Sequence, residues 1–99
     1  MAEIPEIVKD IHAMSNRTAF KISRELKKGP SYANRIAENL NMNEKLINFQ
    51  FAVLKKRGLV KKYEFRETGD PNGPYAATFF MLTDRGVEIF NRLDPHDYQ

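Results

Sequence analysis

The stretch NEKLINFQFAVLKKRG, residues 43–58, carries two conflicting signals for secondary structure. Apolar residues alternate with polar or small ones through its middle, which is the period of a β-strand. The flanks favour a helix, because Asn43 and Glu44 are typical of a helix start and the basic residues before Gly58 suit a helix end. We therefore predict a helix over residues 43–57.

This helix would have two sides of different character. The core side contains Ile47, Phe51 and Leu54, with Leu46 and Gln50 beside them, and the opposite side contains Lys45, Asn48, Ala52 and Lys56, with Phe49 next to them. Lysine and asparagine reach phosphates and base edges, and alanine allows close approach to a groove, although an ordinary solvent-exposed helix side would look the same. Phe49 has three possible explanations: packing under a hairpin, a protein partner, or contact with a thymine methyl group.

Three helices are predicted upstream from apolar spacing and capping residues. The first covers residues 5–14, the second runs from a cap at Ser15 or Asn16 to Lys28, and the third runs from a cap at Ser31 to Leu40. Gly29 and Pro30 stop the second helix, and the polar residues 39–43 turn the chain towards the helix at 43–57.

Downstream, the apolar pattern changes to that of strands. Residues 59–66 (LVKKYEFR) and 76–83 (AATFFMLT) are predicted to form a hairpin around the turn residues DPNG, 70–73. Thr83 then caps a last helix, residues 84–93. The predicted fold class is α+β and mostly helical, with four helices, a two-stranded hairpin and a C-terminal helix.

Length and composition limit the functions that the chain can have. Its 99 residues are expected to form a single domain, and the absence of cysteine excludes disulfide scaffolds and thiolate metal sites. No apolar run reaches the length of a membrane span, so we expect no membrane partner and a cytoplasmic location. The net charge is +3, and a basic cluster over residues 55–62 offers a local surface for a polyanion.

Residues 29–65, GPSYANRIAENLNMNEKLINFQFAVLKKRGLVKKYEF, resemble the winged helix-turn-helix of ArsR-type and MarR-type transcriptional regulators. The shared features are Gly29-Pro30 at a helix end, Ile36-Ala37 in a short helix, the turn from Leu40 to Asn43, and the run from Leu54 to Val60 that opens the wing. Leu82-Thr83 followed by Gly86 is similar to the motif that closes such wings. The resemblance covers residues 17–90 and implies a DNA-binding regulator.

The resemblance also implies which residues contact double-stranded DNA. The helix over residues 43–57 would enter the major groove N-terminus first, with base contacts from Glu44, Lys45, Asn48 and Phe49. Backbone contacts would come from Ser31, Tyr32, Arg35, Lys56, Arg57, Lys61, Lys62 and Arg66. The wing tip departs from the family pattern, because residues 67–74 contain Glu67 and Asp70 and no Lys or Arg, which argues against insertion into the minor groove.

The terminal helices, residues 4–14 and 84–93, carry more apolar surface than one small core requires. The residues concerned are Ile4, Ile7, Val8, Ile11, Ile89, Phe90 and Leu93. We expect them to form a homodimer interface, which would place two recognition helices about 34 Å apart on a roughly palindromic site.

Other functions have weaker support in the sequence. A winged helix used for protein contacts is the main alternative, with Phe49 and the acidic wing tip as its binding surface. An enzyme is not expected, because no paired carboxylates, nucleophile with its base, phosphate-binding glycine loop or metal-ligand spacing is present. His12 and the C-terminal DPHD, residues 94–97, offer metal-ligand atoms, but an acidic tail explains the latter better, so we expect no metal or cofactor. The sequence carries no signal for or against a small-molecule effector.

Overall fold

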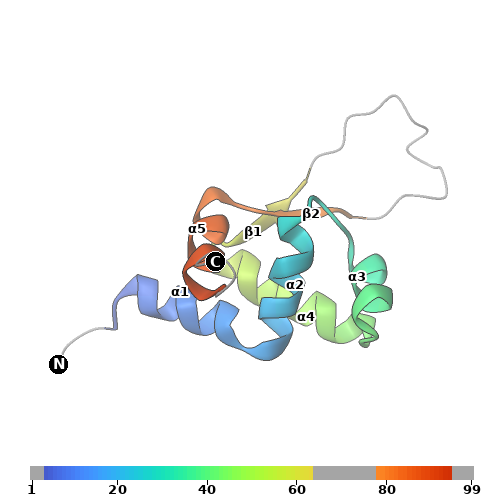
Figure 1. Cartoon of the computed structure of the whole chain (residues 1–99), viewed down its shortest axis with the longest axis horizontal. Coiled ribbons are helices and arrows are strands. Elements are labelled where there is room, and N and C mark those ends of the chain that lie inside the picture. The colour runs from blue at the N-terminus through green and yellow to red at the C-terminus, as the bar shows by residue number, and fades with distance from the viewer. Residues whose placement is uncertain (1–3, 64–77, 95–99) are drawn as a thin grey trace.

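The structure, a computed structural model, describes residues 4–63 and 78–94 (Figure 1). These residues form the helices α1 (Glu6–Ser15), α2 (Arg17–Lys27), α3 (Ala33–Leu40), α4 (Glu44–Lys56) and α5 (Asp84–Leu93), and the strands β1 (Val60–Lys62) and β2 (Phe80–Leu82). The predicted fold class is confirmed, and the ambiguous stretch at residues 43–58 is a helix. No helix in the described ranges has the length and apolar character needed to cross a lipid bilayer.

Side chains cap three of the helices where the sequence indicated a start. The Asn16 side chain accepts an amide hydrogen bond at 2.8 Å, so Asn16 rather than Ser15 caps α2. Asn43 and Thr83 accept equivalent bonds at the starts of α4 and α5, at 2.7 Å and 3.0 Å. Each of these bonds satisfies an amide that has no acceptor within its own helix.

The predicted cap at Ser31 is wrong. Helix α3 begins at Ala33, after Tyr32, and no side chain caps it. Ser31 pairs with β2 instead: its amide donates to the Phe80 carbonyl at 3.0 Å, and its carbonyl accepts from the Phe80 amide at 2.7 Å. This pairing places Ser31 beside the sheet, two residues before the helix starts, so its side chain is too early in the chain to cap α3.

Strands β1 and β2 form an antiparallel pair in which Val60 lies opposite Leu82 and Lys62 lies opposite Phe80. One further bond, from the Tyr63 amide to the residue 79 carbonyl at 2.8 Å, continues the pairing away from the core. The rest of the predicted hairpin, including the DPNG turn and the acidic tip, lies outside the described residues.

Helix α2 packs against every other helix and against β2, so the core forms around it (Figure 1). The largest buried side chains are Met14, Ile22, Ile36, Ile47, Leu54, Leu59, Ile89 and Phe90. Ile47, Phe51 and Leu54 are buried as the helical period predicted. The Phe51 ring also stacks on the Phe80 ring, with centroids 4.3 Å apart, which fixes α4 against β2.

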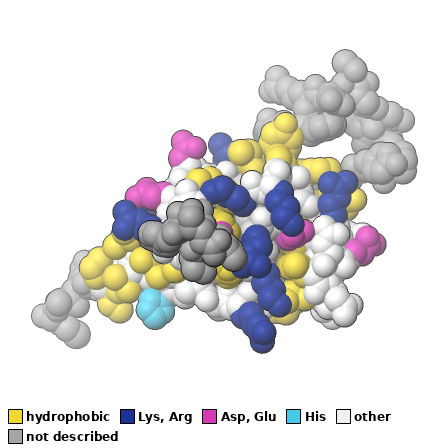
Figure 2. Space-filling view, in the orientation of Figure 1, with side chains coloured by type: hydrophobic (Ala, Val, Ile, Leu, Met, Phe, Trp, Pro, Cys, Tyr) yellow, Lys and Arg dark blue, Asp and Glu magenta, His cyan; other side chains and the backbone are white. Residues whose placement is uncertain are grey.

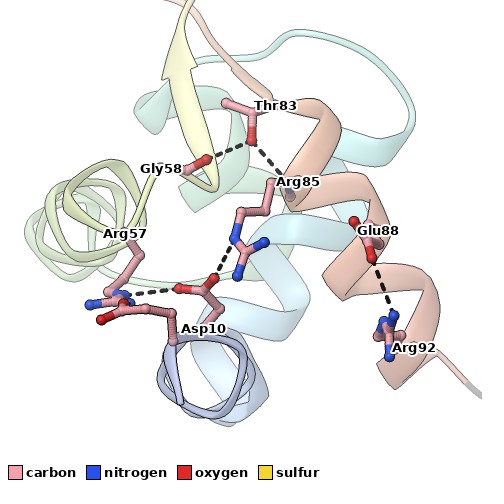
Figure 3. A network of polar contacts seen from close by, with 9 residues as sticks. Asp10, Arg57, Gly58, Thr83, Arg85, Glu88 and Arg92 are labelled. Carbon is pink, nitrogen blue, oxygen red and sulfur yellow. Dashed lines mark hydrogen bonds and ion pairs between the residues drawn. The ribbon is translucent and has the colours of Figure 1, made fainter. Parts of the chain in front are cut away.

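The two sequence motifs at the ends of the wing meet in space (Figure 3). The Thr83 hydroxyl donates to the Gly58 carbonyl at 2.7 Å, and the Thr83 amide donates to the Leu59 carbonyl at 3.0 Å. Gly86 packs so closely against this segment that a Cβ atom added to it would lie 2.0 Å from the Leu59 carbonyl oxygen. These contacts fix the start of α5 to residues 58 and 59, which follow α4 in the chain. Only glycine fits at position 86, because any side chain would collide with the Leu59 carbonyl.

Candidate nucleic-acid interface

A tight turn between α3 and α4 sets the position of α4. Asn41 ends α3 in the left-handed conformation, with φ of 54°, which asparagine adopts more readily than most residues. The Met42 amide then donates to the Ala37 carbonyl at 2.9 Å. Ile36 and Ala37 are buried, so the apolar pair noted in the sequence holds α3 against the core. The turn leads directly into the Asn43 cap of α4.

The side of α4 that points away from the core carries most of the predicted base-contact residues. Lys45, Asn48, Phe49, Ala52 and Lys56 are all exposed there, and we call these five residues the reading face. Phe49 leaves 62% of its surface exposed, so packing under the hairpin does not account for this ring. The reading face thus combines two positive charges, one amide, one aromatic ring and one small side chain.

The first turn of α4 carries the fourth predicted base-contact residue. The Glu44 carboxylate is exposed and accepts a hydrogen bond from the Asn34 side chain at 3.5 Å, which links α4 to α3. Its position in the first turn is favourable, because the positive end of the helix dipole stabilises a carboxylate. A carboxylate here presents acceptor oxygens beside the donors of Lys45 and Asn48.

Two of the predicted backbone-contact residues lie together at the start of α3. The Arg35 guanidinium lies 4.8 Å from the centre of the Tyr32 ring, and that ring lies 5.0 Å from the Phe79 ring, next to β2. The contact orders the exposed Arg35 side chain near the first turn of α3. Ser31 does not lie in this exposed group. The residue is 6% exposed and its backbone is paired with Phe80, so little of its surface could reach a phosphate.

The other backbone-contact residues lie at the far end of α4 and on the wing. Lys56 is exposed at the end of α4, and Lys61 and Lys62 are exposed on β1. Arg66 lies outside the described residues. Arg35 on α3 and Lys61 and Lys62 on β1 thus add exposed positive charge on the elements next to α4, and such charge suits contacts with a nucleic-acid backbone.

Arg57, a predicted backbone contact, is engaged inside the protein. Its Nε atom donates to the Asp10 carboxylate at 2.9 Å, and its terminal nitrogen donates to Glu6. The second Asp10 oxygen accepts from Arg85 at 2.5 Å (Figure 3). Hydrogen bonding to Arg57 holds the pKa of Glu6 below its ordinary value, and the bonds to Glu6 and Asp10 raise the pKa of Arg57. Arg57 therefore positions the end of α4, and its contact with the DNA backbone stays a prediction.

The sequence reasoning missed Asp10, which is only 1% exposed and joins α1, the end of α4 and the start of α5. The sequence did contain a sign that Asp10 is buried, because Asp10 falls on the same side of α1 as Ile7 and Met14. A charged residue on an apolar helix side is buried only when it is paired. The identity of its partners could not be read from the sequence.

The terminal helices divide into a buried part and an exposed part. Ile89 and Phe90 are 0% and 2% exposed, so they belong to the core of one chain and have no surface left for a partner. This corrects their predicted place in a dimer interface. Ile4 and Val8 are 59% and 37% exposed, and the half-buried Ile7, Ile11 and Leu93 pack against the core.

Solved structures share this arrangement of elements. HlyU from Vibrio cholerae N16961 matches with a TM-score of 0.73 over 95% of this chain and 94% of that chain, at 17% sequence identity. A MarR-family transcriptional regulator from Enterococcus faecalis V583 matches with a TM-score of 0.72 over 99% and 86% of the two chains, at 16% identity. An ArsR-family transcriptional regulator, RHA00566, matches with a TM-score of 0.63 over 93% and 87%, at 15% identity.

The chain has the winged-helix fold of the ArsR-type and MarR-type regulators. In this winged-helix fold α3, the turn and α4 form the helix-turn-helix, and β1 and β2 begin the wing. At these identities the likeness concerns the fold alone. No protein-family model matches the sequence, and no curated protein does.

Within residues 4–63 and 78–94, no three His, Cys, Asp or Glu side chains are grouped as they would be around a metal ion. His12 is exposed on α1, and the other histidine, His96, lies outside the described residues.

Replacing Asp10 by asparagine tests whether the buried carboxylate fixes α4. We expect Asp10→Asn to lower the free energy of unfolding by about 3 kcal/mol, because the two arginines lose their common charged partner. Urea unfolding followed by circular dichroism measures the loss. The matched control is Glu88→Gln, which breaks the exposed Glu88–Arg92 pair and should change stability by less than about 0.5 kcal/mol. Equal losses from the two variants would show that Asp10 has no special role.

Proposed function

We propose that the protein is a homodimeric transcriptional regulator that binds double-stranded DNA in a sequence-specific manner. The observation that carries this proposal is the reading face, which points outward from a helix fixed at its start by Asn43 and at its end by Arg57. A rigid helix with outward lysine and amide side chains is what readout of a major groove requires. The likeness in fold to transcriptional regulators supports the proposal.

The chemistry of α4 assigns a different base contact to each residue. Asn48 is suited to adenine, which presents a donor and an acceptor in the major groove, and Lys45 to the two acceptors of guanine. Glu44 accepts from the amino group of cytosine, and Phe49 contacts the methyl group of thymine. Ala52 has no side chain beyond Cβ, so the helix axis can come close to the bases.

The surrounding residues hold the protein on the backbone. Tyr32 and Arg35 at the start of α3 would bind phosphates of one strand, while Lys56, Lys61 and Lys62 would bind the other side of the groove. Arg66 stays in this set as a prediction from the sequence. Arg57 keeps α4 in place, and its own phosphate contact also stays a prediction from the sequence.

The dimer would form through the exposed apolar residues of the terminal helices. Ile4 and Val8 on α1 are the exposed part of this surface, and Ile7, Ile11 and Leu93 form its half-buried base. Two-fold symmetry would then place two copies of α4 about 34 Å apart, one turn of B-DNA, so the site would be roughly palindromic. A dimer bound at a promoter would act most simply as a repressor, by blocking access of the polymerase.

One observation favours a second candidate function, a module for protein contacts. Leu46 is 40% exposed and lies one turn from Phe49, so the flank of α4 presents two large apolar side chains to solvent. Apolar anchors of this kind are typical of protein interfaces. The two functions differ in their response to salt, because only binding to a nucleic-acid backbone releases many counterions.

The assigned roles of Asn48 and Lys62 predict different effects of mutation. A duplex selected from a random pool should bind with a steep negative dependence on salt, and Asn48→Ala should weaken it by about 1–3 kcal/mol while relaxing the preference at one base pair. Lys62→Ala should weaken all duplexes alike and lower the salt slope by about one. Fluorescence anisotropy at four salt concentrations measures both effects. Equal, sequence-independent losses from the two variants would contradict the assignment, and a flat salt response would favour the protein-contact module.

Contact between Phe49 and a thymine methyl group can be tested on the DNA itself. Replacing a contacted thymine by deoxyuridine removes only the methyl group, and it should weaken binding of the wild type by about 0.8 kcal/mol, roughly fourfold. The variant Phe49→Ala should bind thymine and deoxyuridine duplexes equally. Leu46→Ala serves as the control and should keep the wild-type difference. If no thymine in the selected site shows the effect with the wild type, Phe49 has another partner.

The dimer interface is tested by adding a charge to its exposed part. Val8→Glu should convert a dimer to a monomer in sedimentation velocity, because a carboxylate would have to be desolvated in the interface. Lys9→Gln changes the net charge by the same amount at the neighbouring exposed position of α1 and should leave the dimer intact. A wild-type protein that is monomeric at micromolar concentration would rule out this interface.

A further inference from the structure

Helix α2 carries a line of positive charge that the proposed function does not use. Arg17, Lys21, Arg24 and the C-cap residue Lys28 recur at intervals of four, three and four residues, which places them on one side of the helix. They lie opposite the buried residues of α2, and we call them the basic stripe. At 1.5 Å per residue the stripe is about 16 Å long. In the space-filling view, Lys and Arg side chains form a row down the middle of the molecule, over α2 (Figure 2).

The basic stripe and the reading face point in opposite directions. Helix α2 lies in front of α4 in Figure 1 and packs against it. The basic stripe lies opposite the buried residues of α2, and the reading face lies opposite the buried residues of α4, so both surfaces point away from the contact between the two helices. The molecule is about 26 Å thick along its shortest axis. The two surfaces are therefore available to separate ligands.

Three cations of the stripe lack an ion-pair partner within residues 4–63 and 78–94, although the pKa of Glu25 is lowered by its hydrogen bond to Lys28 and, less strongly, by the nearby charge of Arg24. Among the described residues, Arg17, Lys21 and Arg24 form no ion pair, whereas Lys28 is paired with Glu25 at 2.8 Å. Arg24 lies over the Phe20 ring, with its guanidinium carbon 5.0 Å from the ring centre, and this contact limits its freedom. Like charges three and four residues apart repel one another on a helix, and a bound anion would remove that repulsion.

The surroundings of the stripe distinguish between possible partners. The large apolar residues that are exposed in the described structure are Ile4, Val8, Leu46, Phe49 and Tyr63, and none of them is on α2. Protein interfaces take most of their energy from buried apolar and aromatic anchors, so an acidic protein would find no anchor here. A nucleic-acid backbone needs only a line of cations, because counterion release supplies the free energy.

We propose that the basic stripe binds the phosphate backbone of a second DNA segment, so that one protein dimer bridges two duplexes. The first duplex is held through α4, and for that duplex and for the dimer the inference rests on the proposed function. Binding at the stripe is independent of base sequence, because arginine and lysine side chains on a surface helix contact phosphates without entering a groove.

The test is a capture experiment with the full-length protein. A duplex containing the selected site is fixed to beads, and a labelled duplex of unrelated sequence is added with the protein. The wild type should capture the labelled duplex, and the affinity of bead-bound protein for that duplex should fall about 40-fold between 50 and 200 mM salt if three phosphates are contacted. The variant Arg17→Gln/Lys21→Gln/Arg24→Gln should bind the fixed site as the wild type does and lose the capture. Unchanged capture by this variant would overturn the proposal.

A charge-conserving variant provides the matched control. Arg17→Lys/Lys21→Arg/Arg24→Lys alters the same three positions and should capture the labelled duplex as the wild type does, because only the charge matters. Labelled poly-glutamate serves as the acidic polypeptide, and its capture in preference to the duplex at equal salt would overturn the proposal in favour of a protein partner.

A further variant separates failure of the inference from failure of the proposed function. Lys45→Ala/Asn48→Ala should release the fixed site but retain salt-sensitive binding of the unrelated duplex through the basic stripe. If the wild type binds no selected site, the proposed function fails. In that case the inference is supported if the three glutamine substitutions abolish the remaining duplex binding, and it is contradicted if they do not.

Discussion

The position of α4 depends on the buried carboxylate of Asp10. This group receives Arg57 from the end of α4 and Arg85 from the start of α5, and it comes from α1. A charge buried in this way is stable only while both of its oxygens are paired, so the three helices must keep the same relative position. The close contact of Gly86 with the Leu59 backbone also joins the start of α5 to the chain that follows α4. It restricts the relative position of these two segments by steric fit, in addition to the ion pairs of Asp10.

This arrangement connects the proposed dimer surface with the proposed DNA contacts. Helix α1 supplies Asp10 on its inner side and Val8 on its outer side, and a single residue, Lys9, lies between them in the chain. A partner subunit that presses on α1 would therefore act close to the bond that fixes the end of α4. The spacing between two reading faces in a dimer follows from rigid contacts within each chain as well as from the interface itself.

The parts of the structure that the sequence predicted are those with local causes. Caps at Asn43 and Thr83 act on amides within three residues, so the starts of α4 and α5 were placed correctly, and the helical period identified the buried side of α4. The features that the sequence did not predict depend on residues far apart in the chain. Arg57 and Arg85 lie 47 and 75 residues from Asp10, and the pairing of Ser31 with Phe80 involves no side chain. The basic stripe was present in the sequence, but its direction relative to α4 required the packing of the helices.

The backbone pairing of Ser31 with Phe80 has a consequence for how this fold changes over time. Both bonds join main-chain atoms, so any residue other than proline at position 31 can form them. These two bonds therefore place little demand on side-chain identity, although the burial of Ser31 and the stacking of Phe80 on Phe51 limit which side chains fit. Main-chain pairing of this kind does not depend on a particular side chain, which is consistent with one architecture in chains of 15–17% identity. Sequence comparison loses its signal at such positions before the structure changes.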